Sequence, residues 1–311
     1  MNIRTSVLAL AASAFIMAGP AQAQGKLNVV TSTEDLASIT REVGGDRVNV
    51  TALAKGYQDP HFVDPKPSFL LAMGRAHLYI AVGRELETGW LPPLLTSSRN
   101  AKIQPGARGY LDASQNVRIL DIPAGQVTRA MGDVHPLGNP HYWLEPGNGR
   151  RIAQAVRDRL TELSAADKAV FAQRYEDFDQ RLAAAETRWD AAMAPFKGTK
   201  VVTYHRSWPN FMERFGLQVS GYVEPKPGIP PSPSHTVALI DEMKRGGVRL
   251  IVVEPYFSLK TPQAIANQVP GGKVLMLAPS VGGVKEVADY IQLFDYNATL
   301  LAGALKQAGG K

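Results

Sequence analysis

The sequence predicts an α/β protein with two similar lobes, whose parallel-rich sheets are joined by one long rigid helix. Three observations lead to this fold. Short β-rich runs alternate with helical stretches on both sides of the middle, as in parallel sheets wound with helices. A long helical stripe separates the two halves. The chain has 311 residues, which is more than the mean length of one domain, so each half is long enough to bury a core of its own.

The first residues have the features of a cleaved secretory signal over 1–23. Arg4 gives a short basic start, Val7 to Ala18 form an apolar run, and Ala21-Gln22-Ala23 provides a small-residue cleavage site. A transmembrane anchor is the alternative, but the apolar run is well under the ~20 residues needed to cross a bilayer, and Gly19-Pro20 interrupts it. We therefore expect an exported protein, located in the periplasm if the source is a Gram-negative bacterium.

Each half contains four strand candidates. They are Leu27–Thr31, Val48–Leu53, His77–Val82 and Val117–Leu120 in the first half, and Lys200–Tyr204, Leu217–Tyr222, Arg249–Glu254 and Lys273–Leu277 in the second. The run Leu250–Val253 is continuously apolar, as expected for a strand that is covered on both faces. We therefore expect an N-terminal lobe over 24–148, a helical segment over 149–197 and a C-terminal lobe over 198–311.

The helical segment carries one apolar stripe in steps of four and three. Its members are Phe171, Tyr175, Phe178, Leu182, Ala185, Trp189 and Ala192. Ser164, followed by Asp167, fits a helix N-cap, and Pro195 closes the segment, which predicts a helix of about thirty residues or ~45 Å. Such a helix can hold both lobes at a nearly fixed separation. Two helices of a separate bundle domain are the alternative.

Composition excludes several classes of protein and site. There is no cysteine, which rules out disulfides, thiolate metal sites and lipid attachment at a lipobox. The net charge is +6, but the basic residues are scattered and no run of five occurs, so we expect no binding to nucleic acid. We expect a soluble monomer.

Three of the six histidines share one kind of setting. His61 and His141 each follow an Asx-Pro pair, and His205 comes directly after a strand candidate. Ligands in open α/β sheets bind where strands give way to loops, so these residues predict a site in the cleft between the lobes. Imidazole suits zinc, copper, nickel and iron, and three histidines with one oxygen form a normal zinc shell. The spacing along the chain does not by itself identify a metal site.

The other three histidines have different settings. His77 opens a buried strand candidate and is interpreted as structural, and His235 precedes the predicted helix Thr236–Arg245. His135 lies on a Gly/Pro-rich loop six residues before His141, where it is either an accessory metal ligand or a solvent-facing side chain.

The motifs around the three histidines closely resemble those of the periplasmic zinc/manganese-binding proteins of ABC transporters, the ZnuA/TroA-like group. The matching segments are Asp59-Pro60-His61 with Asp64–Ser68, Gly138–Pro146, Tyr204-His205, Val253-Glu254-Pro255 and Tyr296-Asn297. The resemblance implies two α/β domains bridged by a rigid helix, metal ligands at His61, His141 and His205, and docking of the metal-loaded protein on a membrane permease.

Departures from the family pattern bear on the metal. Manganese members resemble this chain but commonly replace the third histidine by Glu, so the retained His205 favours zinc and leaves manganese as the alternative. Those members also have an Asp where this chain has Leu277–Ser280. The fourth ligand is therefore left open between Asp289, Glu254 and water. Asp289 fits equally well as a charge at a helix N-terminus.

The segment Ala124–Asp133 is short where many zinc members carry a long His- and acid-rich loop. Loop-based capture is therefore expected to be weak or to depend on another protein, such as a periplasmic zinc chaperone. A zinc-dependent hydrolase is the alternative of a different class, because a three-histidine site with an open position activates water. Asp64 and Glu145 are the nearby acids, but each adjoins proline and fits a role in the loop backbone better than that of a general base. We therefore expect a binding protein and no enzyme.

Overall fold

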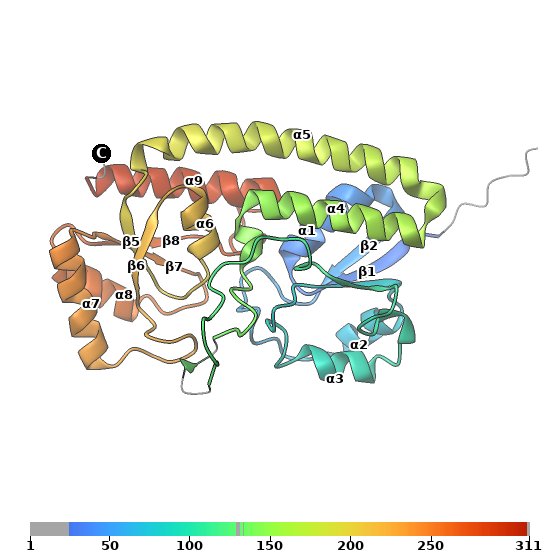
Figure 1. The fold of residues 1–311 in the computed structure, drawn as a ribbon, viewed down its shortest axis with the longest axis horizontal. Helices are drawn as coiled ribbons and strands as arrows, with labels where there is room; N and C mark the ends of the chain where they lie inside the picture. Colours follow the sequence, from blue (N-terminus) through green and yellow to red (C-terminus); the bar gives the residue numbers. More distant parts are fainter. Residues whose placement is uncertain (1–24, 129–130, 133, 310–311) are drawn as a thin grey trace, which may run out of the picture.

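The computed structural model describes residues 25–128, 131–132 and 134–309, and the predicted signal at 1–23 lies outside these residues. It contains two four-stranded sheets in which all strand pairs are parallel, with the orders β2-β1-β3-β4 and β6-β5-β7-β8. The two sheets share the same topology, which confirms the predicted pair of similar α/β lobes (Figure 1). No helix among the described residues is long and apolar enough to cross a membrane.

The N-terminal lobe is built around the first sheet. Its strands are β1 (Leu27–Thr31), β2 (Val48–Ala52), β3 (Leu78–Ala81) and β4 (Tyr110–Asp112), and its helices are α1 (Glu34–Gly44), α2 (Pro67–Gly74) and α3 (Leu91–Ser97). The predicted strand Val117–Leu120 was wrong, because Tyr110–Asp112 takes the edge position by pairing with β3. Val117 and Ile119 instead pack against the core from a loop, which explains their apolar pattern.

The C-terminal lobe repeats this arrangement. Its strands are β5 (Lys200–Thr203), β6 (Gln218–Tyr222), β7 (Leu250–Val253) and β8 (Lys273–Met276), and its helices are α6 (Pro209–Arg214), α7 (Pro233–Gly246) and α8 (Lys260–Gln268). Helix α7 begins three residues before the predicted start, since Ser232 caps it by accepting a hydrogen bond from the His235 backbone N–H.

Three longer helices cover the two lobes on one side. They are α4 (Pro146–Leu163), α5 (Lys168–Met193) and α9 (Tyr290–Gln307). Helix α5 has 26 residues and runs along both lobes, as predicted, while α4 lies against α1 of the N-terminal lobe (Figure 1). The long helix starts later than predicted because Ser164 is bonded to Asp167 across a short 3-10 turn, Ala165–Asp167.

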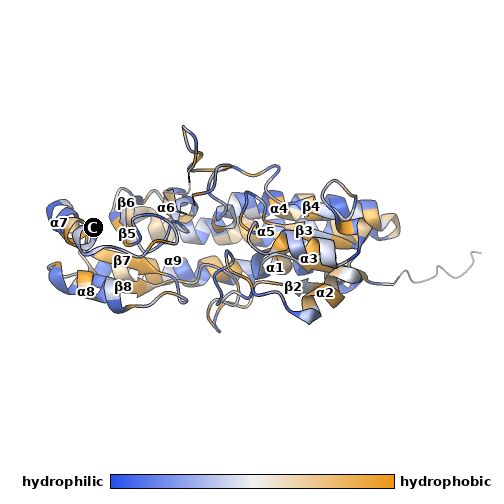
Figure 2. Cartoon of the chain, turned by 90° about the horizontal axis from the view of Figure 1, so that it is seen from below, coloured by the Kyte–Doolittle hydropathy of each residue, from blue (hydrophilic) through white to orange (hydrophobic). Residues whose placement is uncertain are grey.

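One hydrophobic core continues through both lobes beneath the long helices. Buried side chains of α5, such as Phe178 and Leu182, belong to the same cluster as Val29 of β1 and Val201 of β5. Each lobe also has one smaller hydrophobic cluster, which lies under α2 and α3 in the N-terminal lobe and under α7 and α8 in the C-terminal lobe. Figure 2 shows hydrophobic colour on strands such as β7 and a mixture of both colours on α7 and α8. The shared core holds the facing ends of the two sheets in a fixed relation.

The lobes also meet directly through backbone and polar contacts. Asp35 at the start of α1 accepts hydrogen bonds from the Ser280 hydroxyl at 2.5 Å and from the Val281 backbone N–H at 2.9 Å. A side chain at Gly56 would bring its Cβ to 1.9 Å from the Val281 carbonyl oxygen, so only glycine permits this approach. The two lobes are therefore in direct contact at these residues.

Candidate metal centre

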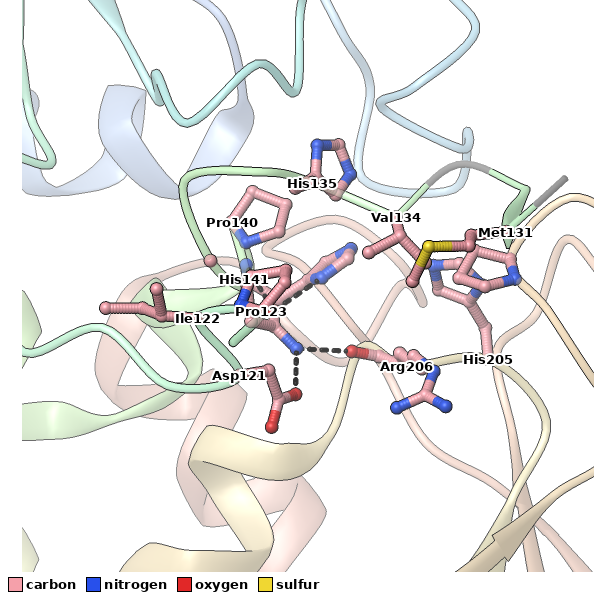
Figure 3. A pocket seen from close by; sticks show the side chains of 13 residues that line it. Asp121, Ile122, Pro123, Met131, Val134, His135, Pro140, His141, His205 and Arg206 are labelled. Atoms are coloured by element: carbon pink, nitrogen blue, oxygen red, sulfur yellow. Dashed lines mark hydrogen bonds between the residues drawn. The ribbon is translucent and has the colours of Figure 1, made fainter. Parts of the chain in front are cut away.

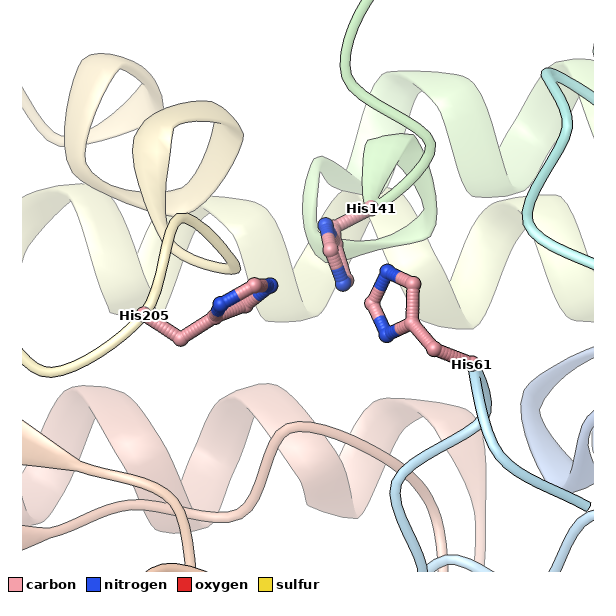
Figure 4. A group of neighbouring side chains, drawn as sticks. All are labelled: His61, His141 and His205. Carbon is pink, nitrogen blue, oxygen red and sulfur yellow. The ribbon is translucent and has the colours of Figure 1, made fainter. Parts of the chain in front are cut away.

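The structure brings His61, His141 and His205 together between the lobes (Figure 4). His61 lies on the loop after β2, His141 precedes the 3-10 turn Tyr142–Leu144, and His205 follows β5. One ring nitrogen of each lies within 4.8 Å of the others, and their ring centroids are 5.2, 5.4 and 5.5 Å apart. His141 and His205 are buried, with 2% and 6% exposure. Three imidazoles from distant parts of the chain thus converge on one point.

Each of these imidazoles hydrogen-bonds an oxygen of another side chain through its Nδ1 atom. The pairs are His61 with Asp59 at 2.7 Å, His141 with Asn139 at 3.0 Å, and His205 with Glu224 at 2.7 Å. An acceptor at Nδ1 fixes the proton there and leaves the Nε2 lone pair free. All three rings are therefore prepared to bind a cation through Nε2.

The Asx-Pro-His sequence explains how two of the rings are held. Asp59 Oδ1 accepts from the backbone N–H of His61 at 3.0 Å as well as from its ring, and Asn139 Oδ1 accepts from the backbone N–H of His141 at 2.9 Å. One oxygen in each motif therefore fixes both backbone and ring. The Asn139 amide in turn donates to Asp121 and to the Arg206 carbonyl of the other lobe (Figure 3).

Burial and charge set the protonation of the group. The pKa of His141 is held well below 6.5 by burial and by the neighbouring histidines. Burial also opposes a charge on His205, but its hydrogen bond to Glu224 and the nearby Glu254 outweigh burial and raise its pKa. Burial would raise the pKa of Asp59, yet its bond to His61 lowers the pKa. The carboxylates therefore supply negative charge around a nitrogen-lined centre.

The group of metal-ligating atoms found among the described residues contains neither of the two proposed carboxylate ligands, and it does not contain His135. Asp289 caps α9, because its Oδ1 accepts a hydrogen bond from the Gln292 backbone N–H at 2.8 Å. Of its two predicted roles, metal ligand or charge at a helix N-terminus, the structure places it in the second. Glu254 is fully buried at the end of β7, which raises its pKa to about 7. It lies beside His205 because β5 and β7 are neighbouring parallel strands.

The remaining histidines occupy different positions. His77 Nδ1 accepts from the Asn28 backbone N–H at 2.9 Å, in agreement with a structural role, and His235 Nε2 lies 2.9 Å from the Tyr222 carbonyl oxygen. His135 lies beside the centre, with its Nε2 at 3.2 Å from the Nε2 of His61. It borders a hollow of about 330 Å³ that reaches His141 and His205 (Figure 3).

Sequence reasoning missed the three residues that orient the rings. Asp59 and Asn139 had a signal, since the Asx-Pro-His pattern occurs twice with the same spacing. Glu224 had none, because it reaches His205 from the loop after the neighbouring strand β6. Only the pairing of β5 with β6 brings these two side chains together.

A model of the family described as ZnuA, zinc-uptake complex component A, periplasmic, matches residues 29–304. The chain belongs to this family. Its ZnuA-type fold is also found in a crystal structure of a ZnuA deletion mutant with zinc bound, which has 26% sequence identity and a TM-score of 0.75 and covers 90% of this chain and 98% of that one.

Curated relatives of this ZnuA-family chain are named for two different metals. The zinc-binding lipoprotein AdcA of Streptococcus pneumoniae is 24% identical over 300 residues, 93% of this chain, and the chain spans only 58% of its length. The manganese ABC transporter substrate-binding lipoprotein ScaA of Streptococcus gordonii is 29% identical over 162 residues, 51% of this chain and 49% of the relative. Relationship alone therefore leaves the metal open within the ZnuA family.

Proposed function

We propose that the protein is the periplasmic zinc-binding component of an ABC importer, which captures zinc with high affinity and delivers it to a membrane permease. The observation that carries this proposal is the convergence of His61, His141 and His205, each with its Nδ1 atom bonded to an acceptor. Membership of the ZnuA family and the zinc-bound relative support transport as the role of the site.

The donor set favours zinc over manganese. The convergent atoms are imidazole nitrogens, which zinc accepts readily, whereas manganese prefers carboxylate, carbonyl and water oxygens. The acidic side chains of Asp59 and Glu224, which contact the rings, are bonded to imidazole Nδ1 atoms. A manganese-binding role is the second candidate, supported by relatives that are named for manganese.

A hydrolase is less well supported. Glu145 caps α4, because its two carboxylate oxygens accept hydrogen bonds from the backbone N–H groups of Gly147 and Asn148. These bonds engage both oxygens that a general base would use to take a proton. The short segment before His135 favours supply of zinc by another protein, such as a periplasmic zinc chaperone. We propose that the chain acts as a monomer.

The proposal is tested on the mature chain, residues 24–311. Metal-free protein is offered equal zinc and manganese, and the bound metal is measured by mass spectrometry. We expect about one zinc ion per chain, and His141→Ala is expected to lose most of the affinity because a ligand is removed. His235→Ala, which changes a histidine bonded to Tyr222, is the matched control. Preferential manganese loading, or unchanged zinc affinity in His141→Ala, would contradict the proposal.

A further inference from the structure

A fourth imidazole lies at the edge of the three-histidine centre. His135 is half-buried, and its ring centroid is 5.3 Å from that of His61. The two Nε2 atoms face each other at 3.2 Å. A tetrahedral zinc shell with Zn–N bonds of about 2.0–2.1 Å puts neighbouring nitrogens about 3.3–3.4 Å apart. The separation of these two atoms is therefore that of two ligands on one zinc ion.

We propose that His135 is the fourth ligand, so that zinc is held by four imidazole nitrogens and by no carboxylate. This inference rests on the proposed function, which it deepens by assigning the open position of the same site. It predicts stronger discrimination against manganese than three histidines and an oxygen would give, because the shell then contains no hard oxygen donor.

The nature of the contact between His135 and His61 depends on which ring nitrogens carry the protons. The ring proton of His61 is held on Nδ1 by Asp59. When the proton of His135 also sits on Nδ1, its Nε2 carries a lone pair that faces His61. With both protons on Nδ1, two Nε2 lone pairs point at each other. A bound cation turns this repulsion into two coordinate bonds.

The backbone at Arg84 and Glu85 is strained next to the segment that carries His135. Arg84 and Glu85 have φ angles of 51° and 65°, in the left-handed region that non-glycine residues rarely adopt. Such backbone strain concentrates at functional positions. Here it accompanies a contact with the segment that carries His135, since the Arg84 guanidinium donates to the Leu137 carbonyl at 3.3 Å. Arg84 thus helps to hold the segment that carries His135.

The chain around His135 leaves room for a small adjustment. Gly132 and Gly138 stand on either side, with φ angles of 73° and 94°. His135 also borders two hollows, one that reaches His141 and His205 and another on the side of His61. The alternative oxygen ligands are less free, since Asp289 caps α9 and Glu254 is buried at the end of β7. A shift of His135 toward the other three rings is therefore the simplest way to complete the shell.

Two measurements test the inference. X-ray absorption of the zinc-loaded wild-type protein is expected to show four imidazole nitrogens, and the visible spectrum of the Co²⁺ form is expected to change in His135→Ala as an oxygen replaces a nitrogen. His135→Ala should also bind zinc at least about tenfold more weakly, or 1.4 kcal/mol, in chelator competition. His235→Ala should change neither the spectrum nor the affinity.

The outcomes separate this inference from the proposed function. Three imidazoles and an oxygen in the wild-type protein, together with unchanged affinity in His135→Ala, would overturn the assignment of His135 even if His141→Ala loses zinc. A loss of affinity in Glu254→Gln but not in His135→Ala would assign the fourth position to Glu254 instead. If the wild-type protein binds no zinc, the proposed function itself fails.

Discussion

Replacement of Glu224 tests whether the oriented ring, and not only the presence of His205, determines zinc affinity. Glu224 is 8% exposed and bonds His205 Nδ1 at 2.7 Å. A hydrogen bond to a charged group contributes about 1.5–3 kcal/mol, which corresponds to about ten- to a hundredfold in affinity. Partners that orient metal-bound histidines have effects of about this size. Glu224→Gln keeps the shape and an acceptor oxygen, so we expect about a tenfold loss, and Glu224→Ala should approach a hundredfold.

The assay is competition for zinc with a chelator of known affinity, on protein whose folding is checked by circular dichroism. Glu242→Gln, an exposed acid on α7, is the control for the loss of one negative charge in the same lobe. If Glu224→Gln, Glu224→Ala and the control all bind zinc as tightly as the wild-type protein, the orienting role of the carboxylate is refuted. An equal loss in the control would instead indicate a general charge effect.

Two further predictions concern the contact between the lobes. Burial raises the pKa of Asp35 from 3.8 to about 7, so the folded state holds this proton more tightly than the unfolded chain does. Its contribution to the free energy of unfolding is full below pH ~4 and is lost as the pH rises to ~7, by on the order of 4 kcal/mol. Urea unfolding between pH 5 and 8 should show this decline. Asp35→Asn should make the decline smaller but not remove it, because burial also raises the pKa of Glu87 and of Glu254 to about 7. The exposed Asp46→Asn should leave the decline as it is in the wild-type protein, and an unchanged slope in Asp35→Asn would refute the assignment. Gly56→Ala should lower the melting temperature and weaken zinc binding, because its Cβ would meet the Val281 carbonyl oxygen at 1.9 Å and push the lobes apart. Gly125→Ala, with nothing within 4 Å of its Cβ, is the control, and equal behaviour of the two variants would contradict this reasoning.

Local patterns in the sequence predicted most of the helices and strands of the fold. Among the residues that the structure describes, the alternation of apolar runs located seven of the eight strands to within one residue, because the burial of a strand shows in its consecutive side chains. The stripe from Phe171 to Ala192 likewise predicted the long helix. The pattern failed at Val117–Leu120, where apolar side chains pack against the core from a loop. A periodic apolar pattern indicates that side chains are buried. A loop that packs on the core buries apolar side chains as a strand does, so the pattern cannot distinguish the two.

The sequence by itself determined the donor chemistry of the site, because Asx-Pro-His turns and a histidine at a strand end are local features. Only the tertiary structure decided which other side chains surround these rings. The pairing of β5 with β6 puts Glu224 behind His205, and the folding of the N-terminal lobe sets His135 3.2 Å from His61. These contacts join residues that are 19 and 74 positions apart, and no local pattern predicts them, because they depend on strand order and on how the loops fold over the sheet.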